Sequence, residues 1–315
     1  MLFSGIHASI AALEQILILW VGETLVIENT MTLGMYVAFN SYRGLFSSRM
    51  TNLINIFFNI RILALYRERI ADIALNEAEE DTYQNLTNIP KKVATLELKN
   101  LTFSYNQFDK PIIKDISLII PAGKSVAIKA PSGFGKTTLL KLMSGLLKST
   151  SGEVYFDGIN INQIGLPNYR SKIAMVLQED KFFSGSIIEN IVSFEDQYDL
   201  EFAIKCAKLA KIHNEIMKMP MNYETRLGEL GNNLSGGQRQ RLFIARALYK
   251  RPYILFMDEA TSYLDEKNEK AINISISQLN ITRVIVAHRQ STIDSADYCV
   301  ELDKLNKNSK YTINL

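Results

Sequence analysis

Three short apolar segments, separated by stretches with helical periodicity, constrain the fold of this chain most strongly. They read KIAMVLQ at 172–178, YILFMDEA at 253–260 and RVIVAHR at 283–289. Consecutive apolar residues, as opposed to apolar residues at every second position, are typical of strands that are buried on both faces. Such strands in alternation with helices predict an α/β domain built on a parallel sheet.

A glycine-rich loop follows another segment of this kind. The sequence KSVAIKA at 124–130 leads into PSGFGKTT at 131–138, and a helical stretch comes next. The loop fits the phosphate-binding pattern G-x-x-x-x-G-K-[ST], except that Ala130 stands at the first glycine. Gly133 and Gly135 let backbone N–H groups approach phosphates, and the start of the helix adds a partial positive charge.

Two side chains of this loop suit a magnesium nucleotide. Lys136 can reach the β- and γ-phosphates, and the Thr137 hydroxyl can bind Mg²⁺. Taken alone, with Ala130 breaking the pattern, the loop is equally compatible with an ordinary strand–turn–helix. A methyl group at residue 130 is tolerated unless the backbone there needs a positive φ, so we expect a competent site.

Two carboxylates end the apolar segment at 253–260. Asp258 and Glu259 are expected at the carboxyl edge of the sheet, where open α/β sheets bind their ligands. Asp258 suits a Mg²⁺ shell, and Glu259 is placed to polarise an attacking water. The alternative is that both residues only cap the following helix. Lys136, upstream in the same predicted sheet, weakens that alternative.

The segment LSGGQRQRLFIARAL at 234–248 is the most specific pattern in the chain. Ser235 is expected to open a helix, and Gly236 and Gly237 leave its first amides bare, which makes a second anion site. The segment resembles the signature of the ATP-binding cassette (ABC) ATPases, and residues 94 to about 302 resemble an exporter-type nucleotide-binding domain. The resemblance implies a head-to-tail dimer, in which each ATP lies between the phosphate loop of one chain and the signature of the other.

Further site residues follow from this resemblance. Tyr105 matches the aromatic residue that stacks on adenine, Gln178 the glutamine that senses Mg²⁺ and the attacking water, and His288 the histidine that contacts the γ-phosphate and helps to position the catalytic glutamate. Asp265 matches the loop that crosses the dimer interface, whereas Tyr263 departs from the alanine usual there. Tyr105 and His288 also have ordinary structural interpretations, as a strand-core tyrosine and a structural histidine.

The expected site is therefore as follows. The residues expected to bind ATP are Tyr105, Ser132, Gly133, Gly135, Lys136, Thr137, Thr138, Ser235, Gly236, Gly237, Gln238 and Asp265. The catalytic residues are Glu259, His288 and Gln178, and the Mg²⁺ contacts are Thr137, Gln178 and Asp258.

The N-terminal quarter of the chain has a different composition. Residues 5–27 are largely apolar apart from Glu14 and Glu23, and residues 32–60 form a second, more polar stretch. A helix needs about 20 mostly apolar residues to cross a membrane. The sequence therefore predicts an α-helical transmembrane hairpin within a domain at 1–75, with the second helix turning one side to other helices or to a wet cavity.

The positive charges give this hairpin an orientation. No Lys or Arg precedes Arg43, and Arg61, Arg67 and Arg69 follow the second stretch. The positive-inside rule then places the following domain in the cytoplasm and predicts a multi-pass protein of the cytoplasmic (inner) membrane. The alternatives are a signal peptide, although no basic n-region or A-x-A cleavage site is present, and a buried hairpin in a soluble protein.

A polar linker is expected at 76–93, before a nucleotide-binding domain at 94–315. Residues 31–47 and 67–81 resemble the final membrane hairpin of colicin V-type peptide exporters, which implies a peptide cargo. Exporters of that class carry six membrane helices and an N-terminal cysteine peptidase domain. This chain is therefore expected to be the C-terminal part of a half-transporter.

Composition limits the possible partners. The net charge of +2 is small and the basic residues are dispersed, which argues against nucleic-acid binding. Two cysteines, Cys206 and Cys299, fit a reducing compartment. We expect an ATP-binding and ATP-hydrolysing subunit of a peptide or bacteriocin exporter, working with Mg²⁺ as a homodimer or with a partner ABC subunit. The alternatives are a remnant that binds ATP without transporting and a soluble ABC ATPase.

Overall fold

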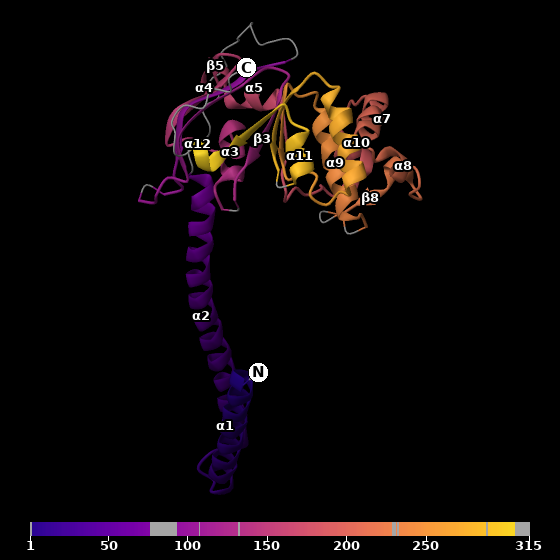
Figure 1. The fold of residues 1–315 in the computed structure, drawn as a ribbon. Helices are drawn as coiled ribbons and strands as arrows, with labels where there is room; N and C mark the ends of the chain where they lie inside the picture. The colour runs from indigo at the N-terminus through magenta and orange to yellow at the C-terminus, as the bar shows by residue number, and fades with distance from the viewer. Residues whose placement is uncertain are drawn as a thin grey trace. The chain divides into compact units, whose positions relative to one another are not determined.

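The computed structural model describes residues 2–75, 93–106, 108–131, 133–228, 231, 233–287 and 289–305. The chain divides into two compact units, Met1–Glu79 and Glu80–Leu315 (Figure 1). The expected linker at 76–93 lies outside the described residues except for Val93.

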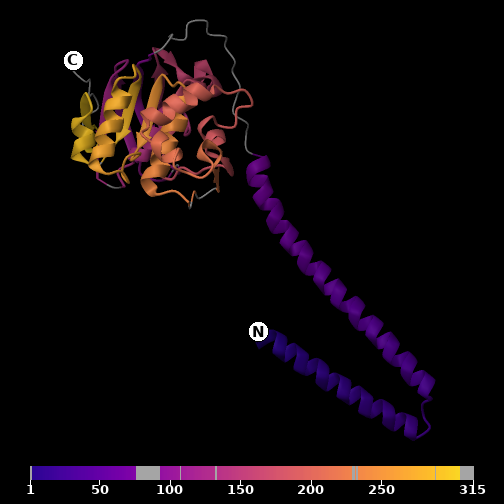
Figure 2. The ribbon, with the colours of Figure 1, turned by 90° about the vertical axis from the view of Figure 1, so that its right-hand side faces the viewer.

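The first unit is a pair of helices, α1 (Leu2–Ile27) and α2 (Leu33–Ala74), which run in opposite directions from the turn between them (Figure 2). Thr32 caps α2, since its hydroxyl accepts the N–H of Met35 at 3.2 Å. Gly22 allows the helices to approach each other, because a Cβ there would come within 2.1 Å of the Tyr36 ring. The two predicted helices are present, and the transmembrane character of the hairpin stays a prediction.

The second helix is longer than predicted. It continues past residue 60 to Ala74, because the segment after Arg61 is rich in Leu, Ala and Arg and contains neither Gly nor Pro. The prediction ended where apolar character falls, whereas the helix continues through a more polar segment of helix-forming residues.

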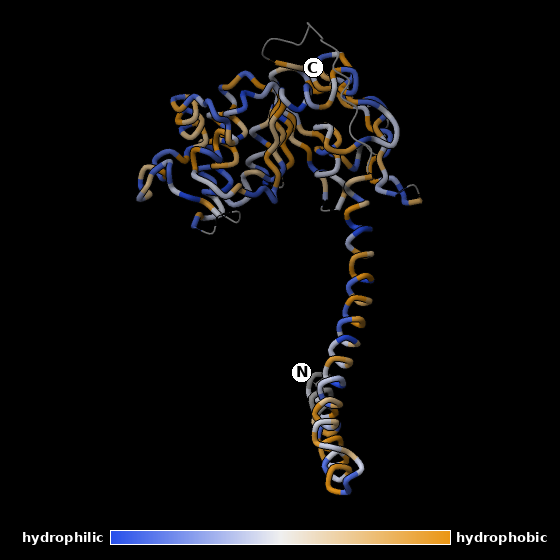
Figure 3. Tube along the Cα trace, turned by 180° about the vertical axis from the view of Figure 1, so that it is seen from behind, coloured by the Kyte–Doolittle hydropathy of each residue, from blue (hydrophilic) through white to orange (hydrophobic). Residues whose placement is uncertain are grey.

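Large apolar side chains are exposed along both helices, among them Leu13, Trp20, Phe39, Phe57 and Leu63. Figure 3 shows hydrophobic positions mixed with hydrophilic ones along α2. Within the described residues, no helix meets both the length and the apolarity required to span a membrane.

The described residues of the second unit form two larger sheets and a short two-stranded one. An antiparallel sheet has the strand order β2-β1-β4-β5. Its strands are β1 (Leu96–Phe103), β2 (Ile113–Ile120), β4 (Ser151–Phe156) and β5 (Ile159–Asn160). Asp157 and Gly158 join β4 to β5 with φ values of 51° and 81°, which is the turn that an Asp-Gly pair predicts. The two-stranded sheet pairs β7 (Gly185–Ser186) with β8 (Arg226–Leu227).

The predicted parallel sheet is confirmed. It has five strands in the order β11-β3-β10-β9-β6, and every neighbouring pair is parallel. Its strands are β3 (Ser125–Lys129), β6 (Ile173–Val176), β9 (Ile254–Asp258), β10 (Thr282–Val286) and β11 (Tyr298–Glu301). Because β10 lies between β3 and β9, the loops that follow these three strands leave the same edge of the sheet side by side.

Both faces of this sheet are buried. Val126 and Ile128 of β3 pack into a core with the antiparallel sheet and α3. Ala127, between them, packs into a second core with α7, α9 and α10. Figure 1 shows α3 on one side of the parallel sheet and α9 and α10 on the other. This double burial explains why the strands read as unbroken apolar segments.

The helices of the second unit complete the layers. They are α3 (Lys136–Met143), α4 (Ile161–Ile164), α5 (Leu166–Ser171), α6 (Ile187–Ile191), α7 (Leu200–Leu209), α8 (His213–Ile216), the 3₁₀ turn η1 (Asn222–Glu224), α9 (Gly236–Tyr249), α10 (Glu266–Ser277), α11 (Gln290–Asp294) and α12 (Leu302–Leu305).

Candidate nucleotide site

The glycine-rich loop joins β3 to α3, as its sequence predicts. Gly133 and Gly135 have φ values of 81° and 82°, which side chains other than glycine rarely adopt. Gly135 is the N-cap of α3 and has no side chain to satisfy the first amides of the helix. The loop therefore presents bare N–H groups at a helix N-terminus, the arrangement that binds phosphate.

Ala130 fits the loop without backbone strain. Its side chain is buried in the core between the two sheets, and it is not among the described residues with positive φ. Because no left-handed conformation is needed at this position, a methyl group is tolerated there. The departure at residue 130 thus leaves the geometry of the loop intact.

The loop borders a cavity of about 330 Å³. It is lined by Ile112, Gly133, Gly135, Lys136, Thr137, Thr138, Gln178 and Glu259. Gln178 follows β6 and Glu259 follows β9, so the parallel sheet brings three distant segments of the chain to one place.

Lys136 is buried at the floor of the loop. Its ammonium group donates hydrogen bonds to the carbonyl oxygens of Ala130 at 2.8 Å and Pro131 at 3.2 Å. Burial lowers the pKa of Lys136, and the negative charges of Glu259 and Asp258 oppose that shift. An ammonium group with only neutral partners in hydrogen-bond reach is suited to receive an anion.

Asp258 and Thr137 form the second polar contact of the site. The Thr137 hydroxyl donates to the Asp258 carboxylate at 2.6 Å. Burial raises the pKa of Asp258 above its ordinary value, while the hydrogen bond from Thr137 lowers it. Both oxygens are hard ligands of the kind that Mg²⁺ prefers.

These residues fit a magnesium ion that is shared with a phosphate group. The described residues hold no cluster of three or more His, Cys, Asp and Glu side chains that could bind a metal by themselves. An ion here would use Thr137, Asp258 and Gln178, with phosphate oxygens and water as its other ligands, which is how Mg²⁺ is usually bound beside nucleotides.

Glu259 has an unusual backbone. Its φ is 50°, and its N–H donates to the carbonyl oxygen of Val286 in β10 at 3.1 Å. A non-glycine residue in this conformation persists only where its surroundings hold it. Glu259 is one of the residues that line the cavity.

Tyr105 lies beside the start of α3. Its hydroxyl is 3.1 Å from the Thr138 hydroxyl, and its ring meets Phe103 edge-on at 4.9 Å. The side chain is 57% exposed, so it is not the strand-core tyrosine of the alternative interpretation. Stacking of this ring on adenine stays a prediction.

The segment at 234–238 opens α9 as predicted. Ser235 and Gln238 form a capping box: the Ser235 hydroxyl accepts the N–H of Gln238 at 3.2 Å, and the Gln238 side chain accepts the N–H of Ser235 at 2.8 Å. A Cβ at Gly236 would lie 3.3 Å from the Tyr263 side chain, and one at Gly237 would lie 3.2 Å from Leu264.

This segment is separate from the cavity in a single chain. None of Ser235, Gly236 and Gly237 belongs to the cavity lining, although all three are described. The Gln238 side chain, which takes part in the capping box of α9, also donates to the Glu215 carboxylate at 2.8 Å. Both interactions are structural. Contacts of this segment with a nucleotide stay a prediction.

The other predicted residues divide as follows. Ser132 and His288 lie outside the described residues. Asp265 is the N-cap of α10, and its carboxylate accepts a hydrogen bond from Asn268 at 2.6 Å. Sequence reasoning missed Gln240, which donates to the carbonyl oxygen of Glu259, and Arg289, which donates to those of Ser262 and Leu264. Gln240 lies between two arginines and Arg289 precedes Gln290, so neither position carried a sequence signal of its own.

Comparison with known proteins agrees with this geometry. Residues 113–262 match the ABC transporter family. A colicin V secretion/processing ATP-binding protein of Escherichia coli is 49% identical over 302 residues, which make up 96% of this chain and 43% of that protein. An alpha-hemolysin translocation ATP-binding protein of Escherichia coli O157:H7 is 35% identical over 90% of this chain and 40% of that protein.

A solved structure has the same fold. A bacterial Atm1-family ABC exporter with ATP bound aligns with a TM-score of 0.70 and 31% sequence identity, over 87% of this chain and 48% of that one. The chain therefore spans less than half the length of the relatives it matches.

Proposed function

Because this chain belongs to the ABC transporter family, we propose that it binds Mg²⁺–ATP at the cavity around Lys136 and hydrolyses it to ADP and phosphate. One observation carries the proposal: Lys136, Gln178 and Glu259 come from three distant segments and line a single cavity. A lysine, an amide and a carboxylate are the groups that phosphoryl transfer to water requires.

Each side chain has a distinct role in this proposal. The amides of the glycine-rich loop and Lys136 bind the β- and γ-phosphates. Glu259 accepts the proton of the attacking water, and Gln178 orients that water. Thr137 and Asp258 would hold Mg²⁺, which when bound would supply positive charge to the phosphate oxygens.

We also propose that the site is completed by a second copy of this chain or by a partner ABC subunit. The signature amides at Gly236 and Gly237 lie outside the cavity lining, so a single chain does not bring both anion sites to one phosphate. The resemblance implies that the signature of one chain meets the ATP of the other, with Asp265 at the interface and His288 at the γ-phosphate.

The helical pair is proposed to belong to the membrane part of an exporter. Support comes from the exposed apolar side chains of α1 and α2 and from the resemblance to peptide secretion proteins. By the same resemblance, the cargo is a peptide and the nucleotide domain is cytoplasmic. Extraction of membranes with alkaline carbonate tests this: the chain stays in the pellet if the pair is inserted and is released if it is not.

The substitution Glu259→Gln tests the hydrolytic role. It keeps the size of the side chain and removes its capacity to accept a proton. Steady-state ATPase activity is expected to fall by about 10²-fold or more, with binding of a labelled nucleotide retained. Glu266→Gln is the matched control, because Glu266 lies on the exposed side of α10 with its side chain 73% exposed. Equal activity of the Glu259→Gln protein and the unaltered chain would show that the catalytic assignment is wrong.

Hydrolysis and transport need separate tests. A chain that binds and hydrolyses ATP but moves no peptide, when expressed as the sole transporter component, would be a remnant rather than an exporter subunit. Export restored by co-expression of a second ABC subunit would instead support a composite transporter.

A further inference from the structure

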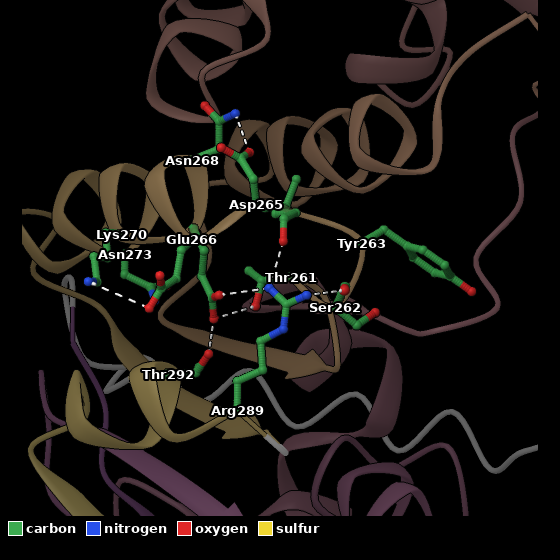
Figure 4. A network of polar contacts seen from close by, with 12 residues as sticks. Thr261, Ser262, Tyr263, Asp265, Glu266, Asn268, Lys270, Asn273, Arg289 and Thr292 are labelled. Carbon is green, nitrogen blue, oxygen red and sulfur yellow. Dashed lines mark hydrogen bonds and ion pairs between the residues drawn. The ribbon is translucent and has the colours of Figure 1, made fainter.

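A buried carboxylate lies beside the loop that joins Glu259 to α10. Glu269, in the first turns of α10, has no exposed surface. Its carboxylate accepts hydrogen bonds from Arg289 at 3.0 Å, from Thr261 at 3.3 Å and from the hydroxyl of Thr292 (Figure 4). Loss of one partner would leave a buried charge uncompensated, so this carboxylate fixes the place of the arginine.

Arg289 uses its other donors on the loop itself. One nitrogen donates to the carbonyl oxygen of Leu264 at 2.6 Å, and the other donates to that of Ser262 at 2.8 Å. Figure 4 shows the guanidinium group between α10 and the loop. Because a guanidinium is planar and its donors point in fixed directions, one side chain here sets the positions of two carbonyl groups.

A second side chain holds the loop from the signature helix. Gln240 of α9 is buried, and its amide donates to the carbonyl oxygen of Glu259 at 3.0 Å and to the Ser262 hydroxyl at 3.0 Å. The N–H of Tyr263 donates to the side-chain oxygen of Gln240 at 2.9 Å. The loop from residue 259 to residue 265 is thus held from two directions.

Such bracing explains the backbone of Glu259. Its φ of 50° is unfavourable for a side chain other than glycine, and it persists where neighbouring bonds over-determine it. The residue is tied to β10 through its own N–H and to α9 through its carbonyl oxygen. Glu259 is the first residue of the braced loop, so a shift of that loop would change the direction in which the Glu259 carboxylate points.

We propose that Arg289, anchored by Glu269, is a positioning residue for ATP hydrolysis: it holds the 259–265 loop so that Glu259 faces the cavity. The inference rests on the proposed function of Glu259. Arg289 is not one of the residues that line the cavity, and in this proposal it does not touch the nucleotide, so it acts on the rate of the chemical step and not on ATP binding.

The test uses the full 315-residue chain with the substitution Arg289→Lys. Lysine keeps the positive charge beside Glu269 but cannot hold two carbonyl groups in a planar fork. The kcat for ATP is expected to fall by about 10-fold or more, because small misplacements of a catalytic group have effects of this size. The KM and the Kd of a non-hydrolysable ATP analogue are expected to change less than about 2-fold.

Three further variants separate positioning from general stability. Arg251→Lys is the matched control, since Arg251 pairs with Asp199 at 3.4 Å on the surface. Glu269→Gln keeps the shape of the anchor, and a loss of kcat in the same direction is expected. Arg289→Lys added to Glu259→Gln is expected to cause no further loss, because the arginine acts through the side chain already removed.

The outcomes are distinct. A kcat within about 2-fold of the unaltered chain for both Arg289→Lys and Glu269→Gln, or a full additional loss in the Glu259→Gln background, overturns the inference. If Arg289→Lys weakens nucleotide binding by the same factor by which it lowers kcat, the inference is also overturned. If the unaltered chain hydrolyses no ATP at all, the proposed function fails instead, and the two failures are told apart by that measurement.

Discussion

The Thr137 hydroxyl donates a 2.6 Å hydrogen bond to the carboxylate of Asp258. The two residues are far apart in the sequence, and they meet because β10 separates β3 from β9 by a single strand. This contact joins the first turn of α3 to the edge of the sheet where Glu259 begins its loop. Substitution of Asp258 tests the role of this contact directly.

Replacement of Asp258 by Asn is expected to stabilise the chain in the absence of Mg²⁺ while it impairs magnesium-dependent activity. Burial raises the pKa of Asp258, so the folded state favours the neutral form of this carboxyl group. Its contribution to stability is therefore greatest at low pH and declines as pH rises through the unfolded and then the folded pKa. Asn removes this decline, and Tm at pH 7.5 without Mg²⁺ is expected to rise by roughly 2 °C or more.

Thermal unfolding across pH, with and without Mg²⁺, checks this prediction. Magnesium needs the ionised carboxylate, so it should stabilise the unaltered chain less as pH falls, and it should have little effect on the Asn variant at any pH. A Tm for Asp258→Asn below that of the unaltered chain at neutral pH would contradict the buried-charge argument.

The substitution Ala130→Gly is expected to leave ATP affinity within about 2-fold and to lower stability by about 0.5–1 kcal/mol, because glycine adds freedom to the unfolded chain. Gly135→Ala should behave differently. A Cβ there would lie 2.5 Å from Ile112 and would require a φ of 82°. Strain of this kind costs about 1–3 kcal/mol, and ATP binding should weaken with it.

The substitution Gly133→Ala separates the effect of backbone strain from that of a steric clash of the added Cβ. A Cβ at Gly133 meets no atom within 4 Å, although its φ is 81°. We expect a stability between those of the other two variants, measured by denaturant unfolding. A Gly135→Ala protein as stable as Ala130→Gly would argue against this geometry of the loop.

Ser235→Ala removes the capping box of α9 and should destabilise the chain by about 1 kcal/mol. Ser186→Ala is a matched control, because Ser186 forms a capping box with Glu189 at the start of α6. Both variants are expected to show similar changes in unfolding free energy. Only Ser235→Ala should also lose ATP-dependent dimerisation, which analytical ultracentrifugation measures. If Ser235→Ala and Ser186→Ala both lose dimerisation, or both retain it, the result would contradict a role of the signature segment in the dimer interface.

Tyr105→Ala is expected to weaken ATP binding by about 1–3 kcal/mol, the contribution of one base stacked on an aromatic ring. Tyr105→Phe keeps the ring and removes the hydroxyl that contacts Thr138. Its affinity should match that of the unaltered chain in a titration with a fluorescent ATP analogue. Weakened binding in the Phe variant would assign the role of Tyr105 to its hydroxyl and not to stacking.

Much of the second unit could be predicted from sequence because its strands are buried on both faces. The unbroken apolar segments that contain β6, β9 and β10 identified the parallel sheet directly. Once those elements are placed, the order of parallel strands brings Lys136 and Glu259 to one edge.

Other features could not be predicted in this way. The bonds that Glu269, Arg289 and Gln240 make to the 259–265 loop depend on how α9 and α10 pack, and sequence alone does not show that a charged side chain is buried. The end of α2 at Ala74 was missed because apolar character was used to set its limit. Tyr263 lies against Gly236 through a similar contact between distant segments.

The length of α2 has a mechanical consequence. A helix of 42 residues extends for about 60 Å, roughly twice the thickness of the hydrocarbon layer of a bilayer. The helix α2 contains no proline, which is the usual cause of a sharp kink. A tilt of one end of such a helix therefore displaces the other end. A pair of spin labels near its two ends would therefore report bending of the helix and rigid swinging as different changes in distance.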